Sequence, residues 1–117
     1  MVNVDGPFYG PLLSPFVFAS PAKLHNSDFK MCVIEPEFGF VMASSLPARG
    51  TLYEEEEVMR AIGSVMPAIE VVDSRYEDWT EVGGLSLIAD NACNAAWIHG
   101  QSKANWSQFE EFQSSYH

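Results

Sequence analysis

The stretch VIEPEFGFV, residues 33–41, places two carboxylates within an otherwise apolar run. The run predicts a β-strand over residues 32–43, in which successive side chains point to opposite faces. One face is wholly apolar, and the other carries Glu35 and Glu37, about 7 Å apart along the strand. Both faces have the composition of buried surface, and burying an ionised carboxylate without a partner costs several kcal/mol. The pattern therefore indicates a positive group between the two acids.

A third acid, Glu70, lies in the middle of a second apolar stretch, PAIEVVD at residues 67–73, which also predicts a strand. If that strand lies beside the first, three carboxylates converge, and oxygen ligands of this kind suit a hard cation such as Mg²⁺ or Mn²⁺. A plainer interpretation stays open. Glu35 and Glu37 could face solvent on an edge strand, which Pro36 permits because proline donates no ladder hydrogen bond.

The overall charge of the chain excludes several classes of partner. The 117 residues include 16 acidic and 6 basic side chains, for a formal charge of −10. This balance argues against binding to nucleic acid or to an anionic membrane. No apolar stretch approaches the ~20 residues that span a bilayer, and the N-terminal stretch lacks the pattern of a signal peptide. Cys32 and Cys93 lack the spacing of metal ligands, so we expect reduced thiols in a cytoplasmic protein, with one disulfide as the open alternative.

The remaining sequence predicts an α+β, β-rich fold in a single domain over residues 1–117. Thr51 and Glu54 match a capping box that would start a helix over residues 52–65. The other expected segments are an approach loop at 1–15, short strands at 16–18 and 95–98, and a divergent tail at 101–117 in which Trp106, Phe109 and Phe112 suggest a short amphipathic helix.

Four stretches carry a resemblance to a known family. They are VDGPFYGPLL (4–13), IEPEFGFVMASSLP (34–47), VMPAIEVVDSRYEDW (65–79) and IADNACNAAWIHG (88–100). In this order they resemble the fumarylacetoacetate hydrolase superfamily, and within it the branch of 2-keto-4-pentenoate hydratases and 4-oxalocrotonate decarboxylases. For the fold, the resemblance implies the central portion of a mixed β-roll with one main helix.

The same resemblance implies a function and a set of site residues. Glu35, Glu37 and Glu70 match the family's ligands to Mg²⁺ or Mn²⁺, and Asp90-Asn91 matches a segment that lines its substrate pocket. From the residues alone, Asp90-Asn91 is also an ordinary turn. The implied activity is that of a metal-dependent lyase in aromatic-compound catabolism, which adds water to, or decarboxylates, a small 2-oxo or 2-hydroxydienoic acid.

The chain also departs from the family. Its members carry an active-site lysine in a preceding segment, and they commonly have an acid where Phe8 stands here, so the catalytic residues stay unassigned. Two alternatives therefore remain: a catalytically silent fragment or partner subunit that retains the metal-binding core, and an acylpyruvate-type C–C hydrolase. Members also continue into further strands, and without these the open sheet edges favour a homo-oligomer or pairing with another chain.

Overall fold

The computed structural model describes residues 6–105. The chain divides into two compact units, Met1–Glu37 with Ala68–Gly100 and Phe38–Pro67 with Gln101–His117. The predicted amphipathic helix around Trp106, Phe109 and Phe112 lies outside the described residues. In the described part, no helix is both long enough and apolar enough to cross a membrane.

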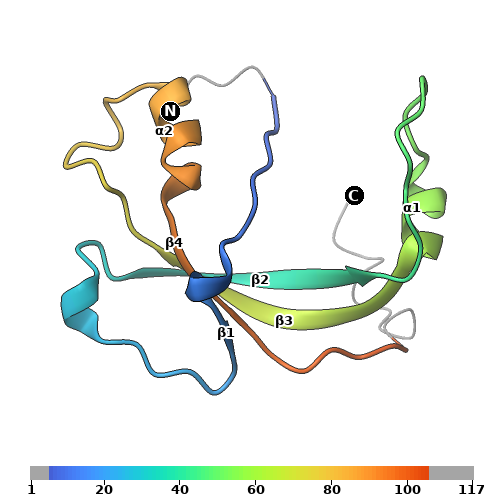
Figure 1. The fold of residues 1–117 in the computed structure, drawn as a ribbon, viewed down its shortest axis with the longest axis horizontal. Coiled ribbons are helices and arrows are strands. Elements are labelled where there is room, and N and C mark those ends of the chain that lie inside the picture. Colours follow the sequence, from blue (N-terminus) through green and yellow to red (C-terminus); the bar gives the residue numbers. More distant parts are fainter. Residues whose placement is uncertain (1–5, 106–117) are drawn as a thin grey trace, which may run out of the picture. The chain divides into compact units, whose positions relative to one another are not determined.

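The architecture is a mixed sheet of four strands with a few short helices, which confirms the β-rich α+β class (Figure 1). The strand order is β1-β4-β3-β2. Strand β4 pairs parallel with β1 and antiparallel with β3. The strands are β1 (Val17–Ala19), β2 (Val33–Met42), β3 (Ile62–Val72) and β4 (Asn94–His99).

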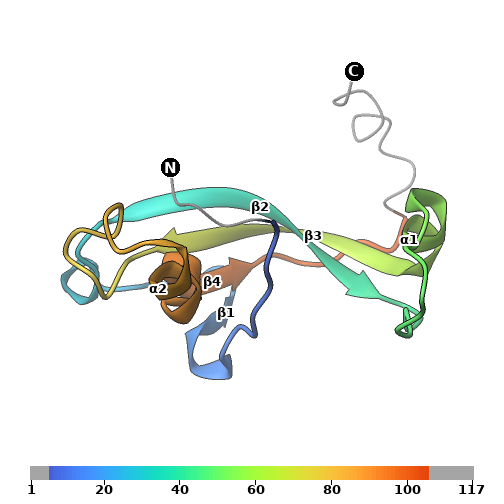
Figure 2. The same cartoon turned by 90° about the horizontal axis from the view of Figure 1, so that it is seen from above.

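In the first unit, β4 lies between β1 and β3 (Figure 2). Small side chains fill its interior, and Ala96 in the middle of β4 is only 1% exposed. Ala68 and Val71 of β3 are also buried. The short helical segments of this unit are η1 (Ser14–Phe16), η2 (Asn26–Asp28), α2 (Gly84–Ala89) and η3 (Asn91–Cys93). Helix α2 was not predicted, and it leads through η3 directly into β4 (Figure 1).

In the second unit, the predicted helix over residues 52–65 is wrong in both its start and its end. Helix α1 spans Glu55–Ala61, and Glu54 rather than Thr51 is its N-cap. The backbone N–H of Glu54 donates to Oε2 of Glu57 at 2.9 Å, which completes a capping box with a different pair of residues. The helix stops before Ile62 because β-branched residues from there onward favour the extended backbone of β3.

The chain also comes close to itself at Gly63. A Cβ atom at this position would lie 2.9 Å from Cβ of Ala43 and 3.3 Å from the carbonyl oxygen of Val41. The backbone N–H groups of Ala43 and Ser44 donate to the carbonyl of Ala61 in the same region. A glycine is therefore required here by the close approach of two backbone segments.

The Arg49–Glu57 ion pair leads to a prediction about acid stability. The guanidinium of Arg49 and the N–H of Glu54 lower the pKa of Glu57 from 4.5 to about 2. Since the pKa is lower in the folded state, this carboxylate stabilises the fold above pH 4.5, and that contribution is lost as the pH falls towards 2. We therefore expect the thermal stability of Glu57→Gln, followed by circular dichroism, to depend less on pH in this window than that of the wild type. Glu55→Gln is the matched control, and an equal pH dependence in wild type and Glu57→Gln would contradict the prediction.

The sequence-based expectation that both faces of β2 are buried is wrong for the described chain. Ile34 is 63% exposed and Val33 is 41% exposed. The reason is the position of β2, which is the last strand in the order of the sheet. Several apolar side chains of β2 are therefore exposed on the surface of the described chain.

Candidate functional site

Two of the three predicted acids lie together in an open hollow of about 270 Å³ within the first unit. We call it the acidic hollow. Its polar lining comes from β2, β3, β4 and the turn before β4, namely Glu37, Glu70, Asn91, Asn94 and Trp97. The antiparallel register places Glu70 directly opposite Trp97, and this pairing brings side chains of β3 and β4 to the same place.

Hydrogen bonds from β4 hold both carboxylates. The indole Nε1 of Trp97 donates to Oε2 of Glu37 at 2.9 Å, and Nδ2 of Asn94 donates to Oε1 of Glu70 at 2.8 Å. The first bond links residues 60 positions apart in the sequence, and the second links residues 24 positions apart. The carboxyl groups therefore have orientations fixed by neutral donors rather than by a lysine or an arginine.

The carboxyl group of Glu70 is affected both by burial and by the two other acids. Burial is the main cause that raises the pKa of Glu70, while the hydrogen bond from Asn94 opposes it. The negative charges of Glu37 and Glu35 raise this pKa further, as does a hydrogen bond between the Glu37 and Glu70 side chains. A bound cation would favour the ionised form of Glu70, because it would offset the negative charges of its two neighbours.

The arrangement of Glu35 differs from that of the other two acids. It is exposed, and only its charge reaches Glu70. Among residues 6–105, no group of three or more His, Cys, Asp or Glu side chains is arranged to hold a metal ion as it stands. Carboxylate oxygens such as those of Glu37 and Glu70 are ligands that suit Mg²⁺ or Mn²⁺.

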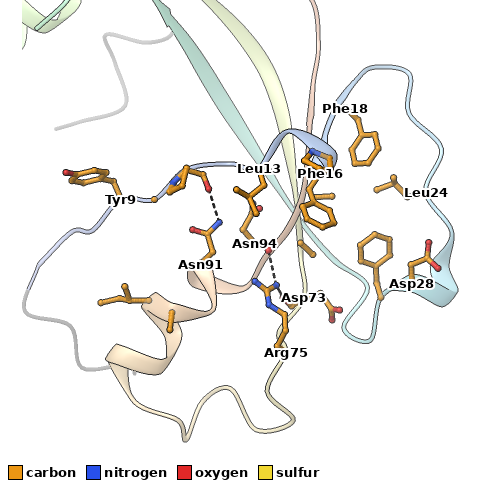
Figure 3. A pocket seen from close by; sticks show the side chains of 18 of the residues that line it. Tyr9, Leu13, Phe16, Phe18, Leu24, Asp28, Asp73, Arg75, Asn91 and Asn94 are labelled. Atoms are coloured by element: carbon orange, nitrogen blue, oxygen red, sulfur yellow. Dashed lines mark hydrogen bonds between the residues drawn. The ribbon is translucent and has the colours of Figure 1, made fainter.

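The two residues expected to bind substrate, Asp90 and Asn91, have different positions. Asn91 lines the acidic hollow, and its Nδ2 lies 3.5 Å from the carbonyl oxygen of Pro11 (Figure 3). The carboxylate of Asp90 is buried and bound on both sides: Oδ1 lies 2.6 Å from Nε of Arg75, and Oδ2 accepts a hydrogen bond from the hydroxyl of Ser74 at 2.7 Å. The structure thus assigns Asp90 to internal contacts.

The turn above this ion pair has an unusual backbone. Asn91, Ala92 and Cys93 have φ values of 51°, 54° and 65°, all in the left-handed region that non-glycine residues seldom adopt. Arg75 stabilises the start of this turn, because its Nη2 also donates to the backbone carbonyl of Asp90 at 2.7 Å. The strained turn is what brings the Asn91 side chain to the hollow.

A second and larger hollow of about 880 Å³, the apolar hollow, lies in the same unit. Tyr9, Asn91 and Asn94 line both hollows, so the two adjoin one another. Phe16, Phe18 and Leu24 gather on one side of Asn94 in Figure 3, and Tyr9 lies on the other. This hollow could not be predicted from the sequence, because its wall combines residues from η1, β1, the loop after β1, α2 and β4.

Comparison with known proteins connects these features to a family, although no family model matches the chain. The 2-keto-4-pentenoate hydratase of Paraburkholderia xenovorans (strain LB400) is 30% identical over 101 residues, which are 86% of this chain and 36% of that protein. A 4-oxalocrotonate decarboxylase of Pseudomonas sp. (strain CF600) is 33% identical over 104 residues, which are 89% of this chain and 38% of that protein.

A solved structure shows the same fold. It is the 4-oxalocrotonate decarboxylase from Pseudomonas putida G7 complexed with magnesium and adipate. The match has a TM-score of 0.76 and 30% sequence identity, and it covers 89% of this chain and 39% of that chain.

The mixed sheet of the described residues thus has the fold of this decarboxylase. The predicted resemblance is confirmed: the chain is a relative of the 2-keto-4-pentenoate hydratases and 4-oxalocrotonate decarboxylases. It spans little more than a third of the length of these relatives.

Proposed function

We propose that this chain carries the divalent-metal-binding core of a lyase of the 2-keto-4-pentenoate hydratase type. The substrate would be a small 2-oxo or 2-hydroxydienoic acid from aromatic-compound catabolism, which gains water or loses CO₂. The observation that carries the proposal is the pair of carboxyl groups of Glu37 and Glu70 in one hollow, held by Trp97 and Asn94. The names of the two relatives and the magnesium in the solved structure support it.

In this proposal, Glu35, Glu37 and Glu70 hold Mg²⁺ or Mn²⁺. The cation, when bound, supplies Lewis-acid polarisation of a 2-oxo group. Two residues of the chain orient the ligands. Trp97 binds one oxygen of Glu37 and Asn94 binds one oxygen of Glu70, so both carboxylates keep a fixed direction. Asn91 lines the same hollow, where its amide can hydrogen-bond a carboxylate or 2-oxo oxygen of the substrate.

Titration with Mn²⁺, measured by calorimetry, tests the metal site. We expect the wild type to bind Mn²⁺, and Glu37→Ala or Glu70→Ala to lower its affinity at least about tenfold, since even the loss of an outer-shell contact has this effect. Glu55→Ala removes an exposed acid at the first turn of α1 and is the control for net charge. Equal binding by the wild type and Glu37→Ala would remove the metal claim.

An assay of 2-hydroxypenta-2,4-dienoate consumption with Mn²⁺ tests the chemistry separately. Turnover that disappears in Glu37→Ala would support the lyase. Metal binding without turnover would favour the second alternative, a catalytically silent partner or fragment. Such a chain would keep the metal-binding core without the acid and base groups that the reaction needs. The names of the relatives favour hydration or decarboxylation over the acylpyruvate-type C–C hydrolase.

Four wider features belong to the same proposal. Residues 1–117 would form the central part of one catalytic domain, and the sheet would be part of a β-roll like that of the fumarylacetoacetate hydrolase superfamily. The protein would act in the cytoplasm, and it would assemble as a homo-oligomer or pair with another chain. The exposed apolar side chains of β2, such as Ile34 at 63%, support this last point, since surface of this kind favours association.

A further inference from the structure

We propose that the apolar hollow receives the tail of the 2-oxo acid, and that this chain selects acids with an uncharged hydrocarbon tail over dicarboxylic acids. The inference rests on the proposed function, which places the head of the substrate in the acidic hollow. It extends that function, because the family names cover both monocarboxylic and dicarboxylic substrates.

The two hollows adjoin one another, so that one elongated molecule could occupy both. Tyr9, Asn91 and Asn94 line both of them. A carboxylate and 2-oxo group near Glu37 and Glu70 would therefore direct the rest of the molecule towards the larger space. At about 880 Å³, this space lies within the size range of small-molecule pockets.

The wall of the apolar hollow suits a hydrocarbon. Aromatic rings of Phe16, Phe18 and Phe29 line it together with Leu24 and Ile88. Figure 3 shows Phe16, Phe18 and Leu24 on the same side of the space. Each methylene group buried against such a wall raises affinity about fourfold.

The charges in the apolar hollow oppose a second carboxylate. Arg75 is the only cationic side chain among the described residues that line it, and its charge is already compensated. Its Nε contacts the buried carboxylate of Asp90 at 2.6 Å, and its Nη1 donates to the carbonyl of Asn94 at 3.0 Å (Figure 3). Asp28 and Asp73 line the same hollow and are both acidic. A distal carboxylate would thus meet two like charges and an arginine that is already engaged.

The preference can be measured with two probes that differ only at the far end. With Mn²⁺ present, we expect 2-oxohexanoate to bind the chain at least about tenfold more tightly than 2-oxoadipate in calorimetric titration, because like charges placed together disfavour binding. Equal or tighter binding of 2-oxoadipate would overturn this inference and leave the metal site intact. Binding of neither probe would instead remove the proposed function, and this inference with it.

A charge reversal in the wall tests where the tail ends. Asp28→Lys should raise the affinity for 2-oxoadipate relative to that for 2-oxohexanoate about tenfold, because it places an uncompensated cation in the hollow. Asp78→Lys makes the same change of net charge at an exposed position that does not line the hollow, so its effect on both probes should be small. A ratio of affinities that is unchanged in Asp28→Lys would contradict the placement of the tail.

Discussion

Replacing Asp90 with alanine is expected to lower the free energy of unfolding by about 3 kcal/mol. The Asp90 side chain is only 2% exposed, and it contacts both Arg75 and the hydroxyl of Ser74. Among the described residues, no buried side-chain nitrogen or oxygen lacks a hydrogen-bond partner. Alanine at position 90 would leave the buried Ser74 hydroxyl and the Arg75 guanidinium without this acceptor, and it would release the left-handed turn that follows.

Urea unfolding followed by far-UV circular dichroism measures this effect. Asp78→Ala, at an exposed position, is the control and should change stability by less than about 0.5 kcal/mol. Asp90→Asn keeps the size of the side chain but loses its charge, so its effect should be intermediate. If Asp90→Ala were as stable as the control, the ion pair would contribute nothing to the fold.

The second large effect is expected for Gly63→Val, which should destabilise the protein by about 2 kcal/mol. The added Cβ would meet Cβ of Ala43 at 2.9 Å, and backbone atoms of Val41 and Ala43 at 3.3 Å. Backbone atoms cannot rotate away as the end of a long side chain can. The strand must therefore shift, and the hydrogen bonds that Ala43 and Ser44 make with Ala61 would be disturbed.

Gly50→Val is the matched control, because nothing lies within 4 Å of a Cβ built at Gly50. Thermal unfolding should show a lower midpoint for Gly63→Val and a nearly unchanged one for Gly50→Val. A midpoint for Gly63→Val that equals that of the control would show that the two backbone segments can separate at little cost.

The sequence predicted the strands better than the helices. The strands predicted at 32–43 and 95–98 correspond to β2 (Val33–Met42) and β4 (Asn94–His99). The helix over 52–65 was overextended, because Val58, Ala61, Ile62 and Val65 fit helical spacing although the last two belong to a strand. Local spacing could not show that pairing with neighbouring strands would take over from Ile62 onward.

The site could be predicted only in part. The apolar runs around the acids predict Glu70 beside the acids of residues 33–41, and Glu37 and Glu70 do share a hollow. That they bind a metal stays a prediction. The role of Asp90 depends on Ser74 and Arg75, which lie 16 and 15 residues away, and no local pattern shows such a contact. The left-handed turn was equally hidden, since alanine and cysteine are not residues that favour positive φ.

The parallel pairing of β1 with β4 has a consequence for the order of events during synthesis. Val17 pairs with Trp97, and Asn91 reaches Pro11, so both hollows join segments about 80 residues apart. Contacts of this kind slow folding, because a long loop must close before any of them can form. On the ribosome, Phe16 and Phe18 would stay exposed until β4, about 80 residues later, has emerged, and during that interval a chaperone could bind them.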